Sequence, residues 1–190
     1  RISQRAIREI YLKPFEIAIK EANPWTVMSS YNKINGTYTS ESKDLLTTIL
    51  RDEWGYQGTV MTDWFGGKDG ATQVWAGNDM LQPGKSEQFS SIVENVKNGK
   101  LKITDLDRNI MRILNLIEKT PRYQSYHYSN RPDLKAHAAI TRQSATEGMV
   151  LLKNNGVLPI QTKASNTQIA LYGCTSYDFI AGGTGSGNVN

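Results

Sequence analysis

Apolar residues along the chain occur in two patterns, short uninterrupted runs and longer segments with a helical repeat. The short runs predict buried strands, because they lack the alternation of a strand with one solvated face. We expect these strands at residues 26–31, 59–62, 79–81 and 168–172. Apolar positions three and four residues apart predict helices. These helices are expected over residues 1–22, 41–54, 71–76, 86–98, 104–117 and 132–148.

Local sequence signals mark where several of these elements begin, turn or end. Pro14 is expected to bend or break the first helix after Lys13. The dipeptide Asn35-Gly36 predicts a turn. Ser40 is predicted to cap the second helix, and Thr104 to open a later one with a Thr-x-x-Asp capping pattern.

The predicted elements alternate strand with helix over most of the chain. This order is typical of βα units with a parallel sheet, so the predicted fold class is α/β. The 190 residues fall short of the roughly 250 that a closed eight-stranded barrel needs. The chain starts inside a helical pattern and ends in a glycine-rich stretch, residues 182–190. We therefore expect a segment of a longer protein, with the strand at 168–172 opening another domain.

Composition and charge exclude several classes of protein. Hydrophobic residues make up 38% of the chain and the net charge is 22 − 18 = +4, which excludes a disordered chain. Lysine and arginine are scattered, so no nucleic-acid partner is predicted. No run of roughly 18 apolar residues exists, so no membrane partner is predicted. With one cysteine, Cys174, and two histidines, we expect no intrachain disulfide, no metal site and no cofactor.

An acidic residue stands at the end of the predicted strand over residues 59–62. Asp63 follows that strand directly, and Trp64 comes next, ahead of a loop rich in glycine. Tyr31 and Asn32 follow the preceding predicted strand. Functional sites in parallel α/β sheets form at such carboxyl ends. A carboxylate there can attack or stabilise an oxocarbenium-like centre, and an indole ring packs on the apolar face of a pyranose. The simpler alternative is that Asp63 only caps the following segment.

Several stretches form an ordered set along nearly the whole chain. They are Tyr11–Phe15, Val27–Asn32 with Asn35-Gly36, Leu50–Gly58, Val60–Trp64, Ala76–Met80 with Pro83-Gly84, and Glu147–Pro159. This ordered set, rather than any single short motif, is similar to the family 3 glycoside hydrolases of the β-glucosidase and β-xylosidase type. The resemblance implies a catalytic barrel followed by an α/β sandwich domain, with the active site between them.

The same resemblance implies a division of the chain. The chain is expected to hold the C-terminal portion of a TIM-type (β/α) barrel, a linker and the first strand of the α/β sandwich domain. Residues 1–118 are assigned to the barrel, residues 119–166 to the interdomain linker and its helix, and residues 167–190 to the sandwich domain. The remainder of the same enzyme is therefore an expected partner of this chain.

The resemblance also implies roles for five residues. Asp63 matches the catalytic nucleophile, and Trp64 matches the aromatic residue beside the leaving group. Tyr31 matches a tyrosine near the nucleophile, and its hydroxyl could donate a hydrogen bond that favours the ionised carboxylate. Met28 matches a wall of the sugar pocket, and Ser186 a serine of the second domain that reaches the pocket. The implied reaction is a double displacement with retention of configuration.

This reaction needs a second carboxyl group that acts first as acid and then as base. The family's glutamate for that role is expected beyond Asn190, whereas Asp79 is interpreted as a residue that organises a loop. The isolated chain is therefore expected to be inactive. The enzyme to which it belongs is expected to hydrolyse terminal non-reducing β-D-glucosyl or xylosyl residues of oligosaccharides or other β-glucosides.

Two other functions stay open from the sequence. One is a sugar-binding or truncated piece without catalysis. The other is a nucleotide-binding α/β protein, although the glycine run over residues 182–187 lacks the third glycine of the dinucleotide fingerprint. The lack of disulfides fits the cytoplasm or the periplasm. The export of many polysaccharide-degrading relatives favours a periplasmic or secreted location.

Overall fold

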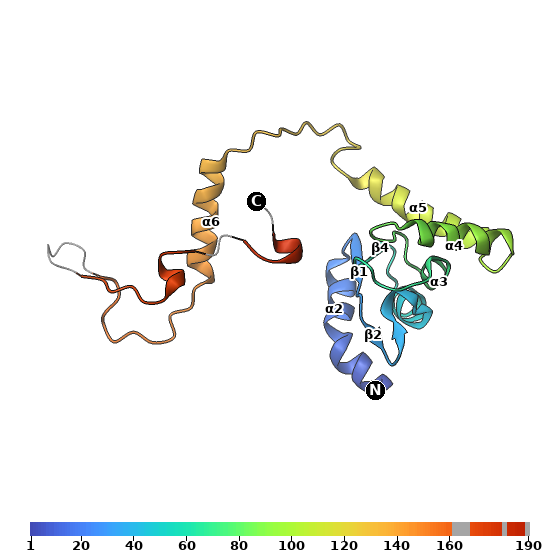
Figure 1. Ribbon diagram of the computed structural model, residues 1–190, viewed down its shortest axis with the longest axis horizontal. Helices are drawn as coiled ribbons and strands as arrows, with labels where there is room; N and C mark the ends of the chain where they lie inside the picture. The colour runs from blue at the N-terminus through green and yellow to red at the C-terminus, as the bar shows by residue number, and fades with distance from the viewer. Residues whose placement is uncertain (161–167, 180–181, 189–190) are drawn as a thin grey trace. The chain divides into compact units, whose positions relative to one another are not determined.

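The computed structural model describes residues 1–160, 168–179 and 182–188. The chain divides into two compact units, Arg1–Tyr128 and Ser129–Asn190. The first unit contains α1 (Gln4–Ala6), η1 (Ile7–Tyr11), α2 (Lys13–Ala22), β1 (Thr26–Ser29), β2 (Lys33–Ile34), β3 (Thr37–Tyr38), η2 (Thr39–Glu41), η3 (Asp44–Glu53), β4 (Thr59–Thr62), α3 (Gly70–Ala76), α4 (Ser86–Lys97) and α5 (Ile103–Lys119). Figure 1 labels several of these elements. The second unit contains α6 (Leu134–Gly148) and the short 3₁₀ turns η4 (Cys174–Ser176) and η5 (Gly185–Gly187).

A pair of parallel strands forms the centre of the first unit. β1 and β4 pair in register from Thr26 opposite Thr59 to Ser29 opposite Thr62. Helix η3 lies between them in sequence, so the two strands and the helix make the predicted βα crossover. The third predicted strand, at residues 79–81, is reduced to a single parallel bridge between Met80 and Met61.

One face of the strand pair is covered by helices. Val60 of β4 is fully buried in an apolar cluster with Ile19 of α2 and with Leu46 and Leu50 of η3. The expectation that both faces are covered is wrong for β1, because Met28 on the other face remains 55% exposed. Helices α2 and η3 cover one face only. On the other face, Thr59 of β4 is buried and its hydroxyl donates to the Arg112 carbonyl of α5 at 3.1 Å. A second cluster packs α3 against α4 and α5.

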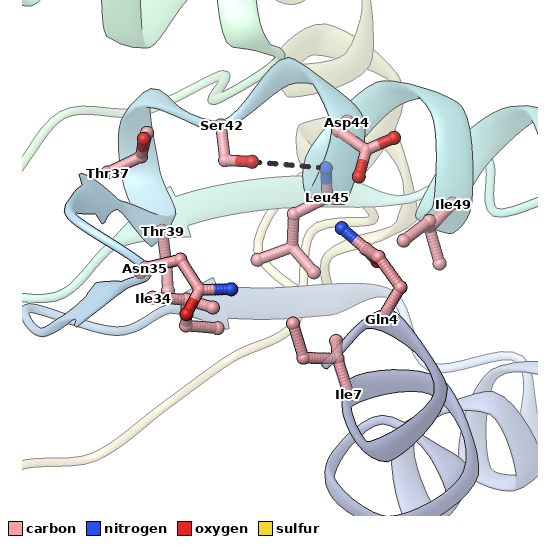
Figure 2. A pocket seen from close by; sticks show the side chains of 10 residues that line it. All are labelled: Gln4, Ile7, Ile34, Asn35, Thr37, Thr39, Ser42, Asp44, Leu45 and Ile49. Carbon is pink, nitrogen blue, oxygen red and sulfur yellow. Dashed lines mark hydrogen bonds between the residues drawn. The ribbon is translucent and has the colours of Figure 1, made fainter. Parts of the chain in front are cut away.

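The beginnings of the helices differ from the sequence-based expectation at three points. The first helical segment breaks at Leu12, and Pro14 lies in the first turn of α2, where its missing N–H costs nothing. Ser40 is buried in η2, and it is the Ser42 hydroxyl that accepts a hydrogen bond from the Leu45 N–H at 3.3 Å (Figure 2). Helix α5 begins ahead of Thr104, which caps nothing.

The turn at Asn35-Gly36 is confirmed. It joins β2 to β3 in a hairpin with φ of 50° at Asn35 and 95° at Gly36. Two successive positive φ values are typical of the tight hairpin turn that favours Asn-Gly. This hairpin brings the segment after β1 back toward η2.

In its described part, the second unit contains the helix α6 and the two 3₁₀ turns, and its other residues form no regular structure. The predicted strand over residues 168–172 is wrong, because these residues adopt no regular structure. A strand needs a hydrogen-bonded neighbour, and the described residues of this unit provide none, so Leu171 and Tyr172 stay exposed. Among the residues described in both units, no helix combines the length and the apolar character needed to cross a bilayer.

Candidate active site

Asp63 lies at the carboxyl end of β4, as the sequence predicts. Its N–H donates to the Ser29 carbonyl at 2.8 Å, which continues the ladder between β1 and β4 by one residue. Its half-buried carboxylate accepts a hydrogen bond from the Trp64 N–H at 2.6 Å on Oδ1. The backbone thus fixes where Asp63 stands, and the next residue fixes how one of its oxygens points.

The predicted aromatic residues lie around this strand end. Tyr31 and Trp64 are 66% and 53% exposed, so both rings are available to a ligand. Tyr31 is close to the loop that follows Asp63, since a Cβ placed on Gly66 would stand 3.4 Å from the Tyr31 Cα. No described group other than the Trp64 N–H donates to the Asp63 carboxylate, so the expected bond from the Tyr31 hydroxyl does not form in this structure.

Met28 shares a face of the strand pair with Asp63. Side chains alternate between the two faces along a strand, and Met28 stands opposite Met61, two residues before Asp63. Met28 also lines an apolar hollow of about 290 Å³ with Tyr11 and Phe15. Ser186 lies in η5 of the second unit, where it is exposed, and its approach to Asp63 stays a prediction.

Buried amides and a carboxylate hold the loop between β4 and α3. We call residues 63–69, which begin at the predicted nucleophile Asp63, the nucleophile loop. The Gln73 side-chain amide, fully buried in α3, donates to the Gly66 carbonyl, and its Oε1 accepts from the Gln88 amide at 3.1 Å. Glu41 Oε1 accepts from the N–H groups of Lys68 at 2.5 Å and of Asp69 at 3.0 Å. The sequence analysis missed all three side chains.

The Asp69 carboxylate closes the loop at the start of α3. It accepts hydrogen bonds from the Thr72 N–H at 3.1 Å, from the Thr72 hydroxyl and from the Ser91 hydroxyl. Burial alone would raise the pKa of Asp69, but these hydrogen bonds hold the pKa below its usual range. The ionised carboxylate therefore caps α3 at neutral pH and ties the loop to α4.

A cluster of charged side chains around Asp79 is bonded to the backbone of β4. The Asp79 carboxylate, with 0% exposure, contacts Arg51 at 2.8 Å and Arg112 at 3.1 Å. It also accepts from the Val60 N–H at 2.7 Å. Burial lowers the pKa of the Arg51 guanidinium to about 10, so Arg51 remains charged at neutral pH. Asp79, interpreted from the sequence as a residue that organises a loop, instead joins β4, η3 and α5.

Another pocket of the first unit is separate from this strand end. It has a volume of about 180 Å³ and lies beside η1, the β2–β3 hairpin and η3, as Figure 2 shows. None of the five predicted site residues lines it. Its Asn35 amide is already paired with the Ile2 backbone through two hydrogen bonds of 2.8 Å. Within the described ranges, no cluster of histidine, cysteine and acidic side chains is placed to hold a metal ion.

Comparison with known proteins finds relatives of the same kind along the whole chain. Residues 1–116 match the glycosyl hydrolase family 3 N-terminal domain. A β-glucosidase of Rhizobium radiobacter is 43% identical over 196 residues, which cover 99% of this chain and 23% of that protein. An exo-α-(1→6)-L-arabinopyranosidase of Bifidobacterium breve is 41% identical over 161 residues, which cover 84% of this chain and 21% of that protein.

Solved structures of β-glucosidases are also similar to this chain. The structure of β-glucosidase 3B from Thermotoga neapolitana in complex with glucose superposes with a TM-score of 0.88 and 44% sequence identity. The superposition covers 100% of this chain and 27% of that chain. The present chain thus spans about a quarter of the length of the proteins that it matches.

Proposed function

Because the chain belongs to glycosyl hydrolase family 3, we propose that it is the part of a retaining β-glycosidase that supplies the nucleophile, Asp63. The proposal places residues 1–118 in the C-terminal portion of the catalytic barrel, with the remaining residues leading into a second domain. The observation that supports it most is the position of Asp63. Its half-exposed carboxylate stands at the carboxyl end of a parallel strand, next to the exposed Trp64 and in a loop that approaches the exposed Tyr31.

The hydrogen bond from Trp64 distinguishes the two oxygens of Asp63. Oδ1 accepts from the Trp64 N–H, and no described residue donates to Oδ2. We assign Oδ2 as the oxygen that attacks the anomeric carbon. As this bond forms, the bond to the leaving oxygen breaks, and a second carboxyl group outside the chain gives that oxygen its proton. The same group then deprotonates a water molecule, which displaces Asp63 and releases the sugar with its original configuration.

The surroundings of Asp63 suit a pyranosyl group at a non-reducing end. The exposed faces of Trp64 and Tyr31 can stack on the apolar face of the ring. Met28, on the same strand face as Asp63, supplies an apolar wall. Relatives are named as β-glucosidases and as an arabinopyranosidase, and one related structure holds glucose. We propose β-D-glucosyl or β-D-xylosyl groups as the substrate class.

The stereochemistry of the product tests this function. Proton NMR of an aryl β-glucoside treated with the full-length enzyme is expected to show the β-anomer of glucose first, with the α-anomer growing only at the rate of spontaneous mutarotation. Two successive displacements at the anomeric carbon restore the starting configuration. A sample of pure β-glucose followed without enzyme gives the mutarotation control. Initial release of the α-anomer would contradict the role of Asp63 as a nucleophile.

A further inference from the structure

The nucleophile loop is fixed at its first residue by a strand, and the Glu41 side chain is one of the groups that hold its last residues. Asp63 belongs to the ladder between β4 and β1 through its bond to Ser29. At the other end, one oxygen of Glu41 accepts from two successive N–H groups, those of Lys68 and Asp69. Hydrogen bonds to a charged acceptor are stronger than neutral ones. Glu41 is therefore a strong anchor for the loop outside the strand.

The middle of the loop contains a residue that needs such anchors. Phe65 has a φ of 60°, a conformation that costs a residue with a side chain about 1 kcal/mol or more. Its N–H reaches the Gln82 carbonyl only at 3.4 Å. The neighbouring Trp64 is the residue whose N–H orients the Asp63 carboxylate. A change of the Phe65 φ to a negative value would therefore also move Trp64, whose N–H binds the Asp63 carboxylate.

Glu41 itself is attached to the other side of the site. It ends η2, and the hydroxyl of Thr39 in the same turn donates to the Ser30 carbonyl at 2.6 Å. Ser30 precedes Tyr31 at the end of β1. The short η2 turn thus connects the strand end that bears Tyr31 with the loop that bears Asp63 and Trp64.

The nucleophile loop has no room for a side chain at Gly67. Gly67 has a φ of 85°, and a Cβ placed there would overlap the side chains of Gln73 and Ser40 and stand 3.0 Å from Glu41 Oε1. Gly36 has a similar φ of 95°, yet a Cβ there would meet nothing within 4 Å. The two glycines therefore share the same backbone requirement and differ in their contacts, which makes them a matched pair for mutagenesis.

We propose that Glu41 is a positioning residue for the glycosidase reaction. Its carboxylate fixes the end of the nucleophile loop, and through Phe65 and Trp64 it fixes the direction of the Asp63 carboxylate. This proposal rests on the proposed function of Asp63. Glu41 contacts neither the sugar nor the reacting atoms in this role.

The test compares three variants of the full-length enzyme. Glu41→Ala removes the acceptor, and the kcat per active site is expected to fall by about 10²-fold, since a shift of about 1 Å in a reacting group costs that much. Glu41→Gln keeps an amide oxygen that can accept both N–H bonds, so its kcat is expected within about tenfold of the wild type. Glu53→Ala removes a glutamate paired with Arg8 at the surface and is expected to leave the kcat unchanged.

Counting active sites separates positioning from simple loss of fold. The burst of phenolate released by a 2-deoxy-2-fluoro β-glucoside gives the concentration of competent sites in each variant, and kcat is divided by that concentration. A residue that only stabilises the fold would lower the number of sites and leave the kcat of each site unchanged. An unchanged kcat per site in Glu41→Ala would overturn the proposal.

A second pair of variants, at Gly67 and Gly36, tests the contact between Glu41 and the nucleophile loop by changing the loop. Gly67→Ala is expected to lower the kcat per site, whereas Gly36→Ala is expected to affect stability only. The double variant Glu41→Ala/Gly67→Ala is expected to lose less than the product of the two single losses, because both changes release the same loop. If the kcat loss of the double variant equals the product of the two single losses, the proposal for Glu41 is overturned. That result would leave the function of Asp63 intact if the fluoroglucoside still labels Asp63. Absence of a burst from the turning-over wild-type enzyme would overturn both this proposal and the function of Asp63.

Discussion

Replacement of Asp63 by asparagine in the full-length enzyme is expected to lower kcat by about four orders of magnitude or more, the loss seen when an enzyme loses its nucleophile. The amide is a very poor nucleophile at the anomeric carbon. Its oxygen can still accept the hydrogen bond of the Trp64 N–H, so the loop keeps its shape. The thermal unfolding midpoint is therefore expected to stay close to that of the wild type. Steady-state hydrolysis of an aryl β-glucoside and a thermal melt measure the two effects.

Asp52→Asn is the matched control for this variant. Asp52 is an exposed aspartate near the end of η3, outside the nucleophile loop, and its replacement is expected to leave kcat and the unfolding midpoint unchanged. Added azide supplies a complementary check with Asp63→Gly, where the small anion can attack in place of the missing carboxylate. The product expected is the α-glucosyl azide. An Asp63→Asn variant that keeps more than about a tenth of the wild-type kcat would exclude Asp63 as the nucleophile.

The largest loss of stability is expected from Asp79→Asn. The substitution leaves the buried cation of Arg51 and the partly buried cation of Arg112 without their counter-charge and turns an amide N–H₂ group toward one of them. Removal of one partner from a buried ion pair typically costs about 3–5 kcal/mol. The free energy of unfolding is expected to fall by that amount in denaturant titrations. Asp79 does not belong to the strand end that bears Asp63, so the kcat of the folded enzyme should change little.

Glu9→Gln is the control for the loss of an ion pair without burial. It breaks the contact of 2.9 Å between Arg5 and Glu9, whose side chains are 83% and 59% exposed. Exposed pairs contribute little because water screens them, so its denaturation midpoint should match the wild type. Equal stability of the Asp79 and Glu9 variants would show that the cluster does not support β4.

The position of Asp63 was predictable because it depends on the local chain. A run of β-branched and apolar residues fixes β4, and the residue after such a strand stands at the edge of the sheet. The parallel pairing with β1 followed from the helix between the strands, and the hairpin turn followed from Asn35-Gly36 alone. The strand and the turn each depend on fewer than about ten neighbouring residues, whereas the pairing depends on the order of strand, helix and strand.

The supporting side chains were not predictable in the same way. Glu41 binds the backbone 27 and 28 residues further on, and Arg51 meets Asp79 at a separation of 28 residues. Contacts of this kind leave no periodic pattern in the sequence. A polar residue such as Gln73 in a short apolar helix was the one available signal, because a buried amide must find partners.

The errors at helix starts and in the second unit have a related cause. Ser40 and Ser42 are both good capping residues, and only the path of the chain through η2 decides that Ser42 serves the following helix. The apolar residues 168–172 have the composition of a strand, but a strand forms only beside another strand. The exposed face of β1 reflects the same dependence on neighbours.

The most direct test is covalent trapping of the full-length enzyme with a 2-deoxy-2-fluoro β-glucoside that has a good leaving group, followed by peptide mass spectrometry. The fluorine destabilises both transition states, and the good leaving group lets the glycosyl-enzyme form faster than it breaks down. We predict one sugar per active site, on the peptide containing residues 60–64 and attached to Asp63. A label on any other residue of an enzyme that turns over, or turnover with no label at all, would contradict the assignment of Asp63 as the nucleophile.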